Sequence, residues 1–204
     1  MADKLYSELN AAAALSASDV VTVQQGGVEI LQTTLGALRT FIGAGGGSKT
    51  YAVLTPLDNQ PPTASFATLD TRNSIAVLDF DDTASEAAVF AQVMSEAAAL
   101  GSGLKIRIHW MATAAVTGNV VWGAQIERSN TDLDADSFDT AATTTGSANA
   151  SSGIVTVTEI LLTTIDSVTA GDLYRLKVYR DAANGSDTMV GDAELVAVEI
   201  RSAT

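Results

Sequence analysis

Four segments in the second half of the chain alternate apolar and polar residues with a period of two. They span residues 104–111, 120–128, 173–180 and 194–201. Successive side chains of an extended strand point to opposite faces, so each segment predicts a strand with one apolar face. Two further runs, 74–80 and 154–163, are mostly apolar and also predict strands. Because Gly- and Asn-containing turns separate them, we expect a mainly β fold, an antiparallel two-sheet sandwich of the jelly-roll type.

The apolar faces of these strands define an expected core. Hydrophobic residues make up 47% of the chain but aromatic residues only 5%, so small side chains must fill most of that core. By strand parity its members are Leu104, Ile106, Ile108, Trp110, Val120, Trp122, Ala124, Ile126, Tyr174, Leu176, Val178, Val196, Val198 and Ile200. The alternative for the two tryptophans is an aromatic platform for sugars together with Phe138. Their parity with Ile and Val favours core packing.

One segment of the sandwich domain has the period of a helix instead. Thr83 and Glu86 have the spacing of a capping box, and Gly101 ends the pattern. The apolar stripe between them consists of Val89, Phe90, Val93, Met94, Ala97 and Leu100. We therefore predict one helix over 84–100. Segment 139–153 consists almost entirely of Thr, Ala, Ser, Gly and Asn, and predicts a long polar loop.

The beginning of the chain has a different pattern. Segments 20–24 and 28–33 flank a pair of glycines and predict a β-hairpin, because hairpin turns need positive φ. Thr34 then caps a short predicted helix over 35–42. The sandwich is thus preceded by a small module of one hairpin and one short helix.

A Gly-rich segment separates this module from the sandwich. Residues 43–50 contain four glycines and predict a flexible hinge. An extended connector into the main domain is marked by Pro56, Pro61 and Pro62. The predicted organisation is therefore a docking module with its hinge, 1–50, and a sandwich domain, 51–204.

The module is too small to fold alone. A hairpin and two helical turns bury little surface, so we expect residues 1–42 to need a partner surface. The apolar residues predicted at this partner contact are Leu5, Leu9, Leu15, Val21, Val23, Val28, Ile30, Leu35, Leu38 and Phe41.

The order of motifs in the module carries a family resemblance. Ser-x-Leu at 7–9, Leu-x-x-x-Asp at 15–19, the hairpin and a Thr-Leu pair at 34–35 follow one another. This order resembles the N-terminal module of tailed-bacteriophage virion proteins, which joins a displayed domain to the particle. The resemblance implies that the partner is the major capsid protein or another virion protein.

The main domain has a second resemblance, over roughly residues 66–201. Its signals are Asp-Phe-Asp (79–81), Ile-His-Trp-Met-Ala (108–112), Val-Trp-Gly (121–123), Asp-x-Asp-Ser-Phe (134–138), Leu-Tyr-Arg-Leu-Lys-Val-Tyr-Arg-Asp (173–181) and Asp-Thr-Met-Val-Gly-Asp-Ala-Glu-Leu (187–195). In this order they resemble a family of phage virion domains. Similarity to phage jelly rolls and decoration proteins further implies a homotrimer.

Charge and composition exclude several classes of protein. The formal net charge of −13 repels phosphate backbones and anionic lipids, so we expect neither nucleic-acid nor membrane binding. The chain has no cysteine and one histidine, which excludes disulfides and the usual structural zinc sites. It has no signal-peptide pattern and no apolar run of about 18 residues. We therefore expect synthesis in the host cytoplasm.

Enzyme motifs are incomplete or missing. Segment 43–50 resembles a phosphate-binding loop, but Ser48 replaces the second glycine and the segment follows a predicted helix. His109 is the only imidazole, no Gly-x-Ser-x-Gly motif occurs, and no internal repeat of a sugar-cleaving β-helix is present. We interpret His109, on the polar face of its strand, as a surface or inter-subunit contact. We expect no enzyme and no cofactor.

Two acidic groups are candidate metal ligands. Asp132, Asp134 and Asp136 alternate as in calcium loops, but Ser137 stands where the tight-turn glycine belongs and residue 143 is Thr rather than Glu. We interpret them as a solvated acidic loop, with a weak calcium site as the alternative. A similar choice applies to Asp79, Asp81 and Asp82, whose simpler role is favourable charge at the N-terminus of the predicted helix.

The few cations gather on one predicted strand. Arg175 and Lys177 alternate with core residues and should face outward, followed by Arg180 and Asp181. In an acidic domain such grouping predicts salt bridges, either within the chain or to an acidic neighbour. The sequence leaves both open.

The leading hypothesis is a non-enzymatic phage virion protein on the outer surface of the capsid. It is a decoration (cement) protein that binds the shell through its N-terminal segment and stabilises it. The alternative is a short tail-fibre or spike protein whose sandwich binds a receptor or a host surface glycan.

Overall fold

The computed structural model describes residues 20–25, 28–34, 48–114, 117–129, 133–135 and 137–203. The chain divides into two compact units, 1–47 and 48–204. In the first unit, β1 (Val20–Gln25) and β2 (Val28–Thr34) pair antiparallel, which confirms the predicted hairpin. Of the predicted docking residues, Val21, Val23, Val28 and Ile30 belong to these strands. The others, namely Leu5, Leu9, Leu15, Leu35, Leu38 and Phe41, and the predicted helix 35–42 lie outside the described residues.

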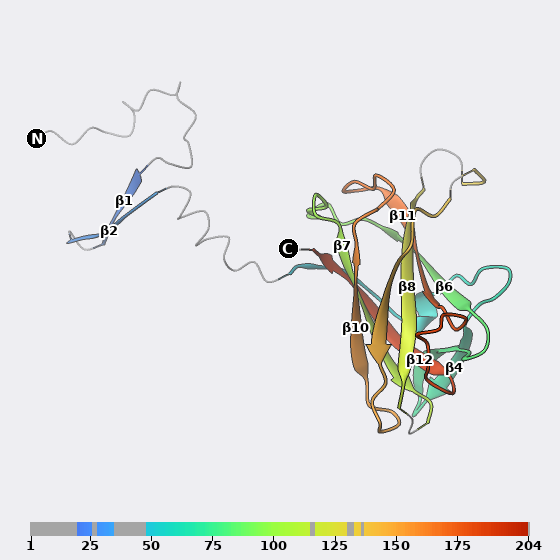
Figure 1. Cartoon of the computed structure of the whole chain (residues 1–204). Coiled ribbons are helices and arrows are strands. Elements are labelled where there is room, and N and C mark those ends of the chain that lie inside the picture. Colours follow the sequence, from blue (N-terminus) through green and yellow to red (C-terminus); the bar gives the residue numbers. More distant parts are fainter. Residues whose placement is uncertain are drawn as a thin grey trace, which may run out of the picture. The chain divides into compact units, whose positions relative to one another are not determined.

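The second unit is a sandwich of two antiparallel sheets, as predicted (Figure 1). The first sheet has the order β10 (Thr156–Leu162), β7 (Leu104–Ala112), β12 (Ala193–Ser202), β5 (Ile75–Phe80), β4 (Thr68–Arg72), and β3 (Thr50–Leu54) also pairs with β12. The second sheet has the order β6 (Glu86–Val93), β11 (Leu173–Arg180), β8 (Asn119–Arg128), β9 (Ala142–Ser147). Strand β12 therefore holds the first sheet together, because β7 lies along one of its edges and β3 and β5 share the other.

The core lies between the sheets and is built around two tryptophans. Trp110 on β7 and Trp122 on β8 are fully buried, with ring centroids 5.7 Å apart in an edge-to-face arrangement. Phe80 packs on Trp122 in the same manner at 5.0 Å. The indole nitrogen of Trp110 donates to Thr158 Oγ1 over 2.9 Å, so its polar atom is satisfied inside the core. The structure thus confirms the prediction that both tryptophans are core residues.

The predicted helix over 84–100 is wrong, because its first half is strand β6. Ala88 and Phe90 face the core, while Ala87 and Val89 on the opposite face are also buried. A strand buried on both faces reads as a continuous apolar run, and such a run also fits one stripe of a helix. None of the described residues forms a helix long and apolar enough to cross a membrane.

The polar residues of the supposed capping box form a turn instead. Asp81 accepts backbone hydrogen bonds from Thr83 and Ala84, and Glu86 Oε2 accepts one from the Asp81 amide over 2.9 Å. Side chains that cap a helix can equally well satisfy a turn before a strand. The carboxylates of Asp79, Asp81 and Asp82 consequently have no helix N-terminus to stabilise.

A β-bulge corrects the predicted parity of β12. The register against β7 shifts between Leu195 and Ala197. Leu195 and Val198 are both fully buried, whereas Val196, a predicted core residue, is only half-buried. The extra residue of a bulge moves one side chain to the other face of the sheet, which a strict period of two misses. All the other predicted core residues are buried.

Two segments predicted as irregular take part in the sheets. The polar segment 139–153 contains β9, which pairs with β8 at the edge of the second sheet. The supposed connector belongs to the sandwich: Leu54 on β3 is fully buried, and Pro56 is also buried. Beyond it, the backbone amide of Gln60 donates to the Val89 carbonyl over 2.7 Å. Together with isolated bridges from Asn59 and Phe66, this bond places segment 59–67 along the edge of β6.

Candidate ligand-binding site

Strand β11 presents a second face to the outside of the sandwich. Tyr174, Leu176 and Val178 point into the core, so Arg175, Lys177 and Tyr179 alternate on the outer face of the second sheet. This confirms the outward orientation predicted for Arg175 and Lys177. The cross-strand partners of Arg175, Lys177 and Tyr179 are, in that order, Ala91, Val89 and Ala87 on β6 and Glu127, Gln125 and Gly123 on β8.

Tyr179 lies against the backbone of β8 at Gly123. These residues are direct partners across the strands, and a Cβ atom at Gly123 would fall 2.1 Å from Cζ of the tyrosine ring. Only a residue without a side chain allows this close approach of ring and backbone. Burial, followed by the charge of Asp181, raises the pKa of Tyr179, so its hydroxyl stays protonated and can donate.

A second aromatic ring, Phe138, lies next to the cations of β11. The Lys177 ammonium is 5.9 Å from the Phe138 ring centroid and 5.4 Å from that of Tyr179, and the Arg175 guanidinium is 5.3 Å from Phe138. The next residue anchors the segment, because the Asp139 amide donates to the Ile126 carbonyl over 2.9 Å. Phe138 is therefore held over the sheet at the distance of cation–π contacts.

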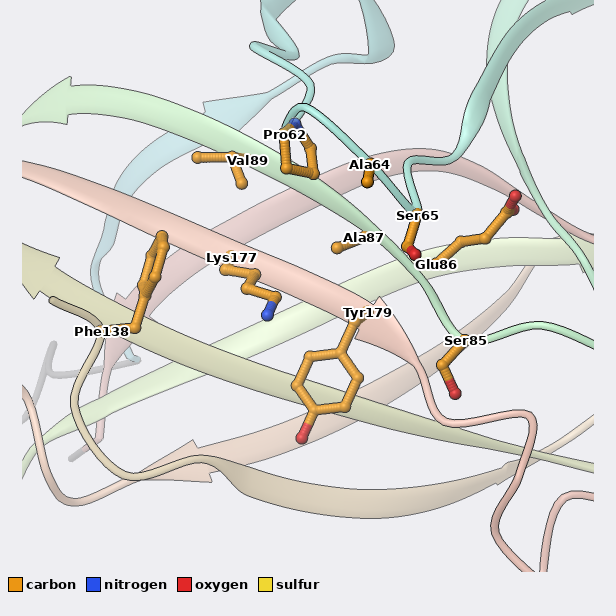
Figure 2. Close-up of a pocket in the computed structure, with 10 residues that line it drawn as sticks. All are labelled: Pro62, Ala64, Ser65, Ser85, Glu86, Ala87, Val89, Phe138, Lys177 and Tyr179. Carbon is orange, nitrogen blue, oxygen red and sulfur yellow. The ribbon is translucent and has the colours of Figure 1, made fainter.

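The opposite wall is formed by segment 59–67. The Ala87 amide donates to the Ser65 carbonyl over 2.9 Å, and the Ala67 amide donates to the Ala87 carbonyl over 3.0 Å. Between this segment and the two rings lies a pocket of about 210 Å³. Its lining consists of Pro62, Ala64, Ser65, Ser85, Glu86, Ala87, Val89, Phe138, Lys177 and Tyr179 (Figure 2). The pocket thus combines two aromatic rings, aliphatic surface, three hydroxyls, one amine and one carboxylate.

Two of the three charged side chains around this pocket are held in place. Arg175 donates twice to the fully buried carboxylate of Glu127, over 2.6 and 2.8 Å. Burial raises the pKa of Glu86, whose Oε2 is occupied by the Asp81 amide. Lys177 differs, because none of the carboxylates in the described ranges lies within 4.0 Å of its Nζ.

Two of the cations on β11 form their ion pairs within the chain. Arg175 pairs with Glu127, and the fully buried Arg180 pairs with Asp187. His109 lies on the outer face of the first sheet, with Nε2 3.1 Å from Glu199 Oε1, which agrees with a surface role.

The candidate metal ligands are distributed differently from the prediction. Asp81 and Asp82 lie near Asp192, with one oxygen of each within 4.8 Å of the others. Burial, then the charges of Asp81 and Asp82, raises the pKa of Asp192, while the Gly191 amide donates to Asp82. Asp79 is not part of this group, and burial, followed by the charge of Glu194, raises its pKa to about 6.

The other predicted metal group is only partly described. Asp134 is exposed, and Asp132 and Asp136 lie outside the described residues. The calcium alternative for these three residues stays a prediction.

Comparisons with known proteins add little to this site. No protein-family model matches the chain, and no curated protein matches it in sequence. Among solved structures it is similar to the CBM22-1 and GH10 modules of an endo-1,4-β-D-xylanase from Clostridium thermocellum complexed with xylohexaose, with 13% identity and a TM-score of 0.41. That match covers 74% of this chain but only 28% of the xylanase chain.

Two further structures are carbohydrate-binding modules. The family 30 module of a cellulosomal cellulase of Clostridium thermocellum has 8% identity and a TM-score of 0.39, over 76% of this chain and 94% of that one. A module specific for non-crystalline cellulose has 9% identity and a TM-score of 0.31, over 68% and 82%.

Sequence reasoning missed the central pair of the site. Tyr179 continues the alternation of Arg175 and Lys177, but the sequence does not connect its ring with the glycine of Val-Trp-Gly at 121–123. A glycine in the middle of a strand is a signal for close approach of another group, and the β8–β11 register supplies that group.

Proposed function

We propose that the sandwich is a non-enzymatic glycan-binding domain whose site is the pocket between Tyr179, Phe138 and segment 59–67. The observation that carries this proposal is the Tyr179 ring resting on Gly123 at the edge of the pocket. A sugar ring has apolar C–H faces and a rim of hydroxyls, so it fits a site that pairs aromatic surface with hydrogen-bonding groups.

The polar lining supports binding rather than cleavage. Ser65 and Tyr179 place hydroxyls around the rings, and the Ser85 hydroxyl, which donates to Asp181 over 3.5 Å, lines the same pocket. Among the residues that line the pocket, Glu86 is the single carboxylate, whereas glycoside hydrolysis generally uses a pair flanking the bond. The geometry therefore favours recognition of a glycan without chemistry on it.

Isothermal titration of the full-length protein with a panel of soluble oligosaccharides tests this function. We expect saturable binding that Tyr179→Ala weakens by tenfold or more, on the order of 1.4 kcal/mol. Tyr51→Ala is the matched control, because Tyr51 lies on β3 of the other sheet. Failure of every glycan to bind, or equal loss in both variants with both folded, would reject the proposal.

For the setting of this domain we propose a phage virion, on the basis of the sequence resemblance. A virion protein of the short tail-fibre or spike type would use the pocket directly for host glycans, with residues 1–47 attaching it to the particle. A capsid decoration protein, the leading hypothesis from the sequence, would present the same pocket on the shell. Counting copies in purified virions separates them, since hundreds per particle fit decoration and a handful fit a tail fibre. A homotrimer is expected in both settings and can be measured by light scattering.

A further inference from the structure

The pocket contains a lysine without an internal counter-ion. Every arginine in the described part of the sandwich has a carboxylate within 4.0 Å, and so does Lys105. Among the described residues Lys177 has none, and neither has Lys49, although the protein carries 24 Asp and Glu against 11 Lys and Arg. In so acidic a chain, an unpaired ammonium inside a pocket is a position that a ligand's negative charge can fill.

The surroundings of Lys177 hold its amine toward the ligand space. Phe138 and Tyr179 lie on either side of it, with ring centroids 5.9 and 5.4 Å from Nζ (Figure 2). Ring faces attract the ammonium but accept no strong hydrogen bond from it, so its donors stay available. Figure 2 shows the Glu86 carboxylate directed away from the Lys177 amine, and that carboxylate already accepts a hydrogen bond from Asp81.

We infer that the pocket selects a sugar bearing a carboxylate, such as a hexuronic or sialic acid, with Lys177 binding the carboxylate while Tyr179 contacts the sugar ring. This inference rests on the proposed function. Ser65 and Ser85 add neutral hydroxyls to the lining of the same pocket. A single ammonium among neutral donors matches one negative charge. Polysulfated chains instead call for several clustered cations, and Arg175 is already engaged by Glu127.

The test compares acidic and neutral sugars of the same backbone on the full-length protein. The pairs are polygalacturonate with its fully methyl-esterified form, and 3′-sialyllactose with lactose. We expect at least one acidic member to bind about tenfold or more tightly than its neutral counterpart, as one partly desolvated ion pair would give. Lys177→Met, which keeps the aliphatic stem, should remove that preference, so that the acidic and neutral members of the pair bind with the same affinity.

Lys105→Met is the matched control, because Lys105 lies on the first sheet and pairs with Glu159 at 3.5 Å. Equal affinity for acidic and neutral members, or an unaltered preference in Lys177→Met, would overturn the inference. If Tyr179→Ala still abolished binding in that case, the glycan-binding function would stand. Binding of no sugar would reject both. Tighter binding of dextran sulfate than of any carboxylated probe would replace the carboxylate by a sulfate and also overturn the inference.

Discussion

The side chains of Arg180 and Asp187, seven positions apart and both buried, form a two-point ion pair. Arg180 Nη2 donates to Asp187 Oδ1 over 2.8 Å, and Nε donates to Oδ2 over 3.1 Å. The remaining donors of the guanidinium reach the carbonyls of Phe80, Met189 and Gly191. One side chain thus ties the end of β11 to β5 and to the segment that leads into β12.

Removal of this arginine should be costly. Arg180→Met leaves the Asp187 carboxylate buried without its counter-ion, so we expect the free energy of unfolding to fall by about 3–5 kcal/mol. Urea unfolding followed by tryptophan fluorescence measures the loss. Lys105→Met removes an exposed ion pair and should cost no more than about 1 kcal/mol. Similar small losses in both variants would contradict the burial of the Arg180 guanidinium.

Gly123→Ala should damage the site more than the fold. The added methyl group would lie 2.1 Å from the Tyr179 ring, so the ring must move away from β8. We expect glycan affinity to fall by tenfold or more and stability by about 1–3 kcal/mol, the usual cost of overpacking. Gly101→Ala is the control, because nothing lies within 4 Å of its Cβ position. Unchanged binding in Gly123→Ala would separate the ring from the site.

Two apolar residues of β6, Phe90 and Val93, differ in burial because the segment is a strand. On the predicted helix, Phe90 and Val93 would share one apolar stripe, but on the strand Phe90 is fully buried and Val93 is 62% exposed. Phe90→Ala should therefore destabilise the protein by about 3–5 kcal/mol, and Val93→Ala by less than about 0.5 kcal/mol. Chemical denaturation distinguishes them. Comparable losses at the two positions would favour the helix.

Asp79 should make the protein less stable as the pH rises. Burial, then the charge of Glu194, raises its pKa to about 6 in the folded state, above the value of about 3.9 in an unfolded chain. The protonated form is therefore favoured by folding, and its contribution to stability, present below about pH 4, is lost as the pH rises through 6. Asp79→Asn should stabilise the protein more at pH 7.5 than at pH 4.5, measured by thermal unfolding. A stability difference that does not vary between the two pH values would refute this assignment.

The fold was predictable where one rule applied along a whole strand. Alternation identified β7, β8 and β11, because apolar and polar residues alternate along most of each strand. It failed at β6, where Ala87 and Val89 on the second face are also buried, and at Val196, where the bulge adds a residue. Both failures depend on partners distant in sequence, which no local period records.

The site was predictable only in its parts. Lys177 was expected outward, and Phe138 was considered as part of a sugar platform, but with the wrong partners. The ring beside it is Tyr179 rather than Trp110 or Trp122, since the two tryptophans face the core. What the sequence alone does not contain is the register that puts Tyr179 opposite Gly123.

The central place of β12 has a consequence for how the protein is made. Strands β3, β5 and β7 all pair with β12, yet β12 is the last of the sandwich strands to be translated. Until it leaves the ribosome, the first sheet has no common neighbour to join its strands, and several edges stay open to other chains. Folding of the sandwich must therefore follow its synthesis rather than accompany it. Ribosome-bound chains that end before residue 193 should be the ones most readily captured by chaperones.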